Sequence, residues 1–587
     1  MQLIRHLRTP ALACSLAVLL CELISHPYAN IGISDDGPYT LVAKHLATTG
    51  HIVYNGWSAA GLVCQLYLGA AFIKLFGFSF TTVRMSTLVV AVLLAFFLQR
   101  IMVRAAISER NATIGTLALV LSPLYLMLSV TFMSDIHGLF AIVLCLYGCL
   151  RALQSQTNQA TISWLCFAVV TNAVGGTSRQ IAWLGILVMV PSTLWLLRGH
   201  RRVLFAGAAA CLAGVLFILG CMVWFKHQPY TTPEHFRINK IPSALAFTPF
   251  IPFFLDIPFL LFPLTVAFIP RIRTLRPRVI AILAAAALLY ARLALHRDYL
   301  PCLEPTMNTG GDWVSIYGLC VGMFNEPIFL ARWARILFTV ATIGGLLGIL
   351  SLFLSPRNTP PIPEPRPVLS WKQLGVLLVP FMSAYVLLLL YRAIEIADAG
   401  TGILFDRYSL GLLLGTAILL VRLYQDRVSP KMSEAWLIPV GLMAIYGIAT
   451  THNNFAVFRA RTELASQLNN AGIPSTQVDN GWEYNVLVEL QYADYINNPQ
   501  IESPAHAVVT VPTPPTGVCQ ALWYDYTPHI HPLYGVSFIP NVCDDLMAVT
   551  PEVYNGPVPL PPVHYSRWLS SSPGTLYVVN YQPASKH

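Results

Sequence analysis

Charge is scarce in this sequence. Asp, Glu, Lys and Arg make up 11% of the 587 residues, hydrophobic residues make up 55%, and the mean hydropathy is +0.60. A soluble globular protein carries about 25% charged residues, and a soluble chain this apolar would need an unusually large core. The shortage of charge therefore argues against a soluble protein. It predicts a polytopic α-helical membrane protein.

Several other features are missing as well. The sequence has no evident internal repeat, few ionisable residues near mid-span and no expected broken helix. Secondary transporters typically have internal repeats, and they place ionisable residues and broken helices at mid-span. The formal charge of +9 does not indicate nucleic-acid binding, because basic residues in such a chain mainly set membrane topology. Metal-ligand spacing is also missing, since the outer histidines, His45, His51, His235 and His296, are scattered. A divalent metal ion is left open.

The apolar runs predict about thirteen transmembrane helices of roughly 20 residues each, the length that crosses a hydrocarbon core. Their approximate cores are 10–26, 79–99, 112–130, 137–151, 161–177, 181–197, 203–224, 250–269, 279–295, 336–354, 374–391, 408–421 and 435–450. A Pro-rich linker, 355–373, separates the first ten from the last three. Residues 1–450 therefore form a predicted transmembrane domain.

Basic residues lie on one side of these spans. Short loops on that side hold Arg5, Arg8, Arg100, Arg104, Arg110, Arg151, Arg198, Arg201, Arg202, Arg422 and Arg427, among others. The positive-inside rule makes this side cytoplasmic. The N-terminus, the loops and the linker on this side are then inside, while the first outer loop, 27–78, and everything after residue 450 are outside.

Residues 451–587 are no longer membrane-like and predict a small α/β domain outside the membrane. "FAVFRARTELASQLNNAG" predicts an amphipathic helix that stops at Gly472, and "HAVVTVP" and "TLYVVNY" predict strands. "DNGWEYN", 479–485, is polar and aromatic, as both sugar-binding loops and ordinary surface loops are. The outer cysteine pairs Cys302–Cys320 and Cys519–Cys543 are either disulfides or free thiols.

The first outer loop carries two adjacent carboxylates, Asp35 and Asp36, just before a predicted helix. Pro38 suits the first turn of that helix and Gly50 suits its end. One aspartate would serve as an N-cap, but two adjacent carboxylates repel each other unless a cation or a proton donor offsets them. Helix capping, a catalytic role and phosphate binding at the helix start all remain open.

Further ionisable residues gather at the outer ends of the spans. They include Arg84, Asp135, Arg179 and Arg407, the last followed by Tyr408. A solvated turn would explain Asp135, and anchoring at the membrane interface would explain each arginine alone. Together they favour a site at the outer membrane–water boundary. Such a site suits a substrate with a lipid tail and a charged head, because arginine binds phosphate well.

A set of short motifs occurs along the chain in the same order as in a known family. Asp35 and Asp36, Tyr39, Ala43 and Gly50, then "NGW" at 55–57, "LFGFSFTTVR", "RNA", "SPLYL", "MSD" and "DRYSLGLLL" occur in sequence. This set resembles GT-C superfamily glycosyltransferases that use a polyprenyl-phosphate sugar. The group is glycosyltransferase family 39-like, the bacterial relatives of protein O-mannosyltransferases and of the lipid A aminoarabinose transferase. Two positions depart from it: Asp36 replaces the usual Glu, and "SAAG" replaces prolines.

The resemblance implies a membrane glycosyltransferase that transfers a sugar from a polyprenyl-phosphate donor to an extracytoplasmic glycan, lipid or protein, with inversion. It makes Asp35 the expected base, with Asp36 as a catalytic partner. Asp135, Lys44, Arg179, Arg407 and Tyr408 are the expected substrate-binding residues. The implied location is the bacterial inner membrane. The alternative is a transporter or flippase of lipid-linked sugars, which would not need a base.

Overall fold

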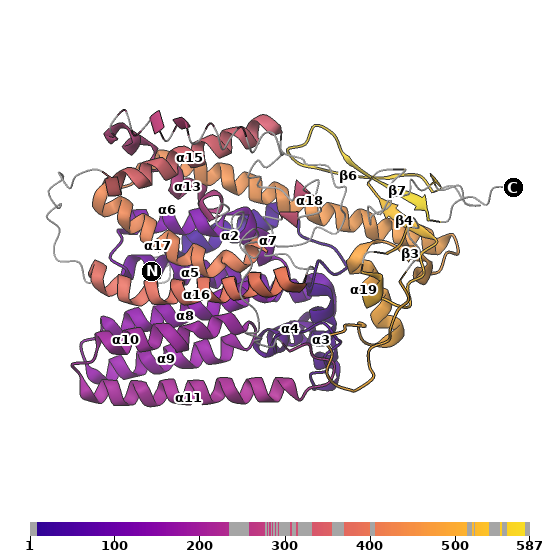
Figure 1. The fold of residues 1–587 in the computed structure, drawn as a ribbon, viewed down its shortest axis with the longest axis horizontal. Helices are drawn as coiled ribbons and strands as arrows, with labels where there is room; N and C mark the ends of the chain where they lie inside the picture. The colour runs from indigo at the N-terminus through magenta and orange to yellow at the C-terminus, as the bar shows by residue number, and fades with distance from the viewer. Residues whose placement is uncertain are drawn as a thin grey trace.

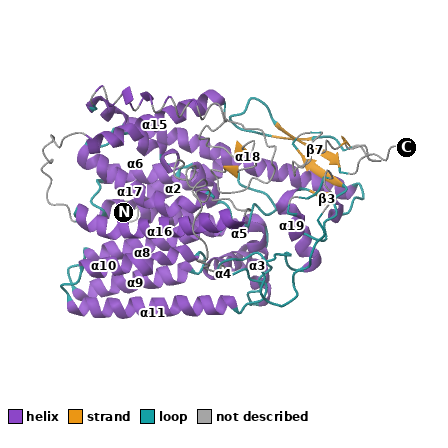
Figure 2. Cartoon of the chain, in the orientation of Figure 1, coloured by secondary structure: helices purple, strands orange, loops and turns teal. Residues whose placement is uncertain are grey.

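The computed structural model describes residues 9–233, 257–275, 331–354, 369–399, 405–513 and 560–581, most of 519–540, and short pieces between 277 and 314 and at 552–553. Figures 1 and 2 show a bundle of long helices with a small mixed domain at one end, near the C-terminus. The predicted fold class, a helical membrane region followed by a small α/β domain, is confirmed.

The bundle is built from helices that largely follow the predicted spans. Its first block contains α2 (Pro10–Ser25), α5 (Phe80–Arg104), α6 (Glu109–Val120), α7 (Pro123–Ser129), α8 (Ser134–Leu153), α9 (Asn158–Gly176), η1 (Gln180–Trp183), η2 (Gly185–Met189), α10 (Val190–Leu196) and α11 (Arg201–Lys226). The later helices are α13 (Phe262–Val266), η4 (Ile269–Thr274), α15 (Arg332–Leu354), α16 (Trp371–Ala399), η5 (Asp406–Ser409), α17 (Leu410–Arg427), η6 (Glu434–Trp436) and α18 (Leu437–Asn470).

Seven helices of the described residues are long and apolar enough to cross a membrane, or eight if one bent pair counts as a span. The predicted spans at 10–26 and 181–197 appear as shorter apolar helices. Most of 279–295, and most of the linker, lie outside the described residues. The prediction of about thirteen spans is therefore not settled.

The bent pair is a correction to the sequence analysis, which expected no broken helix. α6 and α7 meet at 68°. Pro123 starts α7 and has no backbone N–H to continue the preceding helix, while the hydroxyl of Ser122 caps the new one. Beside α7, the buried carboxylate of Glu22 accepts hydrogen bonds from the hydroxyls of Ser25 and Ser129.

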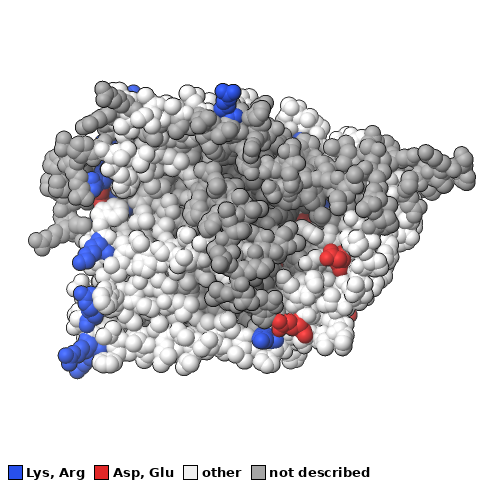
Figure 3. Space-filling model, viewed as in Figure 1, with Lys and Arg blue, Asp and Glu red and all other residues white. Residues whose placement is uncertain are grey.

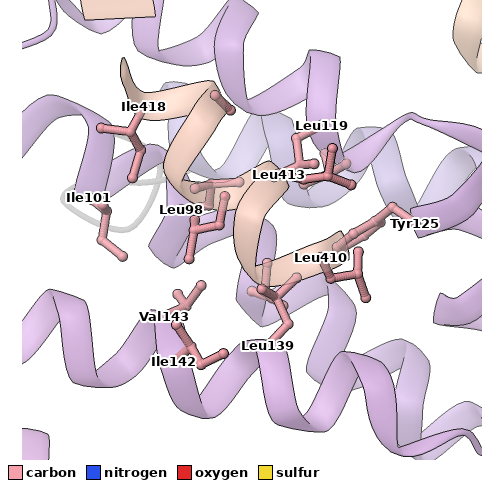
Figure 4. Packing of buried hydrophobic residues seen from close by; sticks show 14 of the residues in the cluster. Leu98, Ile101, Leu119, Tyr125, Leu139, Ile142, Val143, Leu410, Leu413 and Ile418 are labelled. Carbon is pink, nitrogen blue, oxygen red and sulfur yellow. The ribbon is translucent and has the colours of Figure 1, made fainter. Parts of the chain in front are cut away.

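Leucine, isoleucine and valine side chains fill the centre of the bundle, where α5, α6, α8 and α17 meet (Figure 4). Leu98, Val143 and Leu413 are fully buried there. The apolar contacts hold the starts of α5, α8 and α17 at one end of the bundle. This matters because the ionisable residues Arg84, Asp135 and Arg407 lie in or just before these starts.

The two ends of the bundle differ in charge. Arg104 donates to the amide oxygen of Gln154, and Arg422 donates to the carbonyls of Ala105 and Ala106, so these basic residues share one end. On the face shown in Figure 3, most described Lys and Arg side chains lie along the end opposite the C-terminal domain. We call these the basic end and the domain end.

The first outer loop folds into two helices at the domain end, α3 (Asp36–Thr49) and α4 (Val63–Phe76). The predicted stop of α3 at Gly50 is confirmed, since Gly50 adopts φ 80°. The two helices pack through Val42, Leu46 and Leu66.

The C-terminal domain stands on α18. The predicted span 435–450 and the predicted amphipathic helix form this one continuous helix, which ends just before Gly472. The domain adds η7 (Ser475–Gln477), α19 (Gly481–Ala493) and η8 (Tyr524–Tyr526), and a sheet of β3 (Val478–Asp479), β4 (Tyr534–Ser537), β5 (Glu552–Val553), β6 (Val563–Tyr565) and β7 (Gly574–Asn580). The strands β1 (Thr306–Met307) and β2 (Trp313–Val314) pair elsewhere in the chain.

One strand prediction is confirmed and one is wrong. "TLYVVNY" forms β7, which pairs antiparallel with β4, while β3 pairs parallel with β4. "HAVVTVP" forms no strand. Its Val509 exchanges two backbone hydrogen bonds with the side-chain amide of Asn497 instead of with another strand.

Eight cysteines of the described residues are free thiols, from Cys14 to Cys221. Cys519 is disulfide-bonded. Cys302, Cys320 and Cys543 lie outside the described residues, so both predicted pairings stay predictions.

Candidate active site

Asp35 holds the N-cap position of α3 without capping it. Its side chain makes no hydrogen bond to the helix start. Its Oδ2 lies 3.0 Å from Nη2 of Arg407, and its Oδ1 accepts a hydrogen bond of 2.9 Å from the indole N–H of Trp57. The side chain is 19% exposed. Helix capping therefore does not explain Asp35, which is a reachable carboxylate held by two donors.

Asp36 has a different environment, because it is fully buried in an ion pair with Arg84. Nε of Arg84 lies 2.7 Å from Oδ2, and Nη2 lies 3.1 Å from Oδ1. The backbone N–H groups of Ile33 and Phe132 also donate to this carboxylate. Asp36 thus ties the loop before α3 to α5 and to the turn before α8. The anchoring interpretation of Arg84 is wrong, since its side chain is 0% exposed.

Asp135 and Arg179 form a second pair. Asp135 lies in the first turn of α8, and its Oδ1 is 2.8 Å from Nη1 of Arg179, which also donates to Ser134. The Asp135 side chain is 0% exposed. It is therefore not the solvated turn residue that its position in the sequence allowed.

Arg407, the partner of Asp35, lies beside the second pair. Asp135, Arg179 and Arg407 line one cavity together with Tyr385 and with apolar residues of α8, η1 and α17: Leu139, Ile142, Ile181 and Leu410. The rings of Tyr408 and Phe405 lie against the Arg407 guanidinium, and Tyr408 also faces Arg179. Nε and Nη1 of Arg407 are buried and have no hydrogen-bond partner in the described part of the chain.

These orphaned donors matter because a buried N–H without a partner is costly. The cavity therefore presents unused guanidinium donors beside apolar walls. An anionic group with an apolar tail is the kind of ligand that would satisfy both.

Tyr39 stands one helical turn into α3, among the same charges. Burial, reinforced by the negative charge of Asp35, raises the pKa of its phenol well above the ordinary value. Tyr39 therefore stays neutral at physiological pH and keeps a hydroxyl that can donate.

Two predictions of ligands find less support in the geometry. Lys44 is exposed on α3, and its ammonium lies over the ring of Phe78, 4.6 Å from the centroid, not at the described cavity. Among the described residues no group of three or more His, Cys, Asp or Glu side chains could hold a metal ion. Asp36, with Arg84 on both oxygens, does not fit a metal ligand.

Sequence reasoning gave no role to Trp57 or Tyr385. Trp57 was visible only as part of the "NGW" motif, and nothing in the sequence indicated its bond to Asp35. Tyr385 lies inside an apolar run of α16. The ring of Tyr385 packs against Gly411, where an added Cβ would overlap the ring.

Comparison with known proteins supports the resemblance. Residues 63–226, from α4 to α11, match the family model described as dolichyl-phosphate-mannose-protein mannosyltransferase. This match confirms the predicted resemblance over that part of the chain. No curated protein matches the chain.

Solved structures with a similar course of the chain include ArnT from Cupriavidus metallidurans in the apo state, at 15% identity and a TM-score of 0.38, covering 80% of this chain and 82% of that one. The archaeal oligosaccharyltransferase AglB from Archaeoglobus fulgidus has 15% identity and a TM-score of 0.39, with 88% and 63% covered. The Pmt1–Pmt2 complex of S. cerevisiae has 15% identity and a TM-score of 0.30, with 37% and 33% covered.

Proposed function

We propose that this chain is a membrane glycosyltransferase that moves a sugar from a polyprenyl-phosphate donor to an acceptor outside the membrane. The observation that carries the proposal is that Arg407, the ion-pair partner of Asp35, lines one cavity with Asp135, Arg179 and apolar side chains. The family match over residues 63–226 supports the same reaction class.

Asp35 is the proposed general base. An acceptor hydroxyl loses its proton to the carboxylate as its oxygen forms a new bond to the anomeric carbon of the sugar. The bond between that carbon and the phosphate oxygen breaks, and the electron pair leaves with the polyprenyl phosphate. Attack opposite the leaving group inverts the anomeric carbon. The partial exposure of Asp35 leaves room for this approach.

Arg407 and Arg179 are the proposed partners of the leaving phosphate. The free Nε and Nη1 of Arg407 supply charge-assisted donors, which stabilise charge that develops on the phosphate. Asp135 holds Arg179, and Tyr408 packs between the two arginines. The apolar wall formed by Leu139, Ile142 and Leu410 suits the first prenyl units.

Asp36 is the proposed partner of Asp35 in position only. Its ion pair with Arg84 fixes the loop that carries Asp35. Breaking a buried pair by removing one partner costs about 3–5 kcal/mol. Asp36→Asn should therefore lower stability more than Asp35→Asn, because the carboxylate of Asp35 is partly exposed.

The proposed location is the bacterial inner membrane, with the basic end in the cytoplasm and the domain end in the periplasm or outside. The loop charges support this orientation. The acceptor, a glycan, a lipid or a protein, would meet the donor at the domain end.

The test is transfer by the purified full-length chain in liposomes, with radiolabelled polyprenyl-phosphate mannose as donor and a cell-envelope extract as acceptor. Release of free polyprenyl phosphate and label in the extract are measured. Asp35→Asn keeps the shape of the side chain and an acceptor oxygen for one of its two donors, Trp57 and Arg407, but cannot take a proton. It should fold normally and lose about 10²–10⁴ in rate.

Asp525→Asn is the matched control, since Asp525 is an exposed aspartate of the C-terminal domain. It should transfer at the wild-type rate. Wild-type transfer by a well-folded Asp35→Asn protein would reject Asp35 as base. If the wild-type protein itself transferred no sugar, the transporter or flippase would be the better account.

A further inference from the structure

Trp57 determines how one oxygen of Asp35 is held. Its indole N–H donates to Oδ1 at 2.9 Å, while Oδ2 faces Arg407 at 3.0 Å. Two donors from different elements fix the plane of the carboxylate. Arg407 would also serve the donor phosphate, so Trp57 is the contact left to orient the base.

The C-terminal domain holds the Trp57 ring in place. The ring centroid lies 4.6 Å from that of Trp482 in α19 and 5.7 Å from that of Tyr526 in η8. Trp482 is buried and packs with Val486 and Ile496. The direction of the indole N–H is therefore set largely by side chains that follow the last span.

The backbone beside Trp57 is fastened to the same domain. The N–H of Ile496 donates to the carbonyl of Asn55 at 2.8 Å. The N–H of Gly56 donates to the carbonyl of Tyr230, whose own N–H donates to the carbonyl of Ser503 in that domain. Gly56 has φ 85°, and a Cβ there would overlap the carbonyl oxygen of Ile496. The glycine of the "NGW" motif thus lets the loop that follows α19 approach the backbone beside Trp57.

A second contact reaches the residue before Asp35. Ser34 has φ 54°, a strained conformation for a residue with a side chain. Its N–H donates to Oε1 of Glu483 at 3.3 Å. Glu483 is the neighbour of Trp482 in α19 and pairs at 3.2 Å with Arg461 of α18, both side chains being 1% exposed.

We infer that α19 of the C-terminal domain is part of the active site, with Trp57, Trp482 and Glu483 acting as positioning residues for Asp35. The domain thereby completes a site whose reacting groups all come from the membrane region. "DNGWEYN" is then the start of this positioning helix and not a surface loop. This inference rests on the proposed function.

Trp57→Phe is the first test, because it removes the N–H while keeping an aromatic ring beside Trp482 and Tyr526. Losing a donor disfavours the charged carboxylate, so the acid limb of the pH–rate profile should move up by about one pH unit. The groups around Asp35 that also titrate or carry charge are Tyr39, Asp135, Arg179 and Arg407. They are unchanged in this variant. The kcat should fall about tenfold or more, with little change in KM.

Trp523→Phe is the matched control. Trp523 packs edge-on against Trp482, 5.2 Å between centroids, whereas the side-chain donors to Asp35 are Trp57 and Arg407. Its pH–rate profile should equal that of the wild type. Identical profiles for Trp57→Phe and the wild type would overturn the role of Trp57.

A second arm needs no activity. Glu483→Ala should speed hydrogen exchange of a peptide spanning 29–37 in the full-length protein. Glu489→Ala removes an equally buried carboxylate from the same helix, but one bound to His529, and should leave that peptide unchanged. Equal exchange in both variants would overturn the role of α19.

The two arms separate this inference from the proposed function. If the wild type transfers no sugar yet Glu483→Ala loosens only residues 29–37, the reaction is wrong while α19 still positions the loop.

Discussion

Asp35 and Asp36 show how two neighbouring identical residues acquire separate tasks. Asp36 is neutralised by Arg84 out of reach of solvent, while Asp35 keeps one exposed edge between Trp57 and Arg407. The positive charges of Arg84 and Arg407 thus offset the repulsion between the two adjacent carboxylates. Each aspartate has its own arginine, and each arginine comes from a different span.

Gly138 makes a testable contribution at this scale. It lies on α8, and a Cβ there would be 2.8 Å from Cβ of Arg179. Alanine normally favours a helix over glycine by about 1 kcal/mol. Here Gly138→Ala should instead displace Arg179 from Asp135 and lower the transfer rate about tenfold or more, as measured with the labelled donor.

Gly441→Ala serves as its control, because nothing lies within 4 Å of a Cβ at this helical position. That variant should be as active as the wild type and at least as stable to heat. A fully active Gly138→Ala protein would mean that the position of Arg179 does not limit transfer.

The sequence identified Asp35, Asp135, Arg179 and Arg407 as one group because they share a side of the membrane. It could not pair them, since Asp35 and Arg407 are 372 residues apart. The sequence also could not tell which of the charged side chains are buried. The sequence position of Arg84 predicts an interfacial residue. In the structure its guanidinium is buried and donates to the carbonyls of Ala29 and Ile31.

At the scale of elements, α18 joins the helical bundle to the C-terminal domain without interruption. Hydropathy separates its two halves, so the sequence predicted a span and a separate helix. Hydropathy does not determine whether the helix is continuous. No glycine or proline occurs between residues 448 and 470, so no residue there would interrupt the helix. Helix α3 and strand β7 were predictable from local signals, whereas Val509 pairs with an asparagine side chain 12 residues away, which no local pattern reveals.

Ala456→Pro tests this continuity. Ala456 is buried where α18 contacts the domain core, and proline in a helix interior costs about 3 kcal/mol or more. We expect a lower unfolding temperature and faster proteolytic release of the C-terminal domain. Ala456→Gly, which costs about 1 kcal/mol, should do much less. Equal proteolysis of both variants would contradict a rigid connection.

For the whole molecule, sidedness is the property that function depends on. The basic end and the domain end lie on opposite ends of the bundle. If the basic end is cytoplasmic, alkaline phosphatase fused after His587 should be active, since it folds only outside the cytoplasm. The same enzyme inserted at Gly199, in a basic loop, should be inactive. The reverse result, at equal expression, would invert the orientation.

The length of α18 ties the site to the thickness of the membrane. Its 34 residues span about 51 Å, against a hydrocarbon core of about 30 Å. One rod therefore sits in lipid at its start and carries Arg461, the partner of Glu483, near its end. A thicker or thinner bilayer must tilt this rod or deform around it, at fractions of a kcal/mol per Å. Bilayer thickness thus acts on the height at which α19 meets the Asp35 loop.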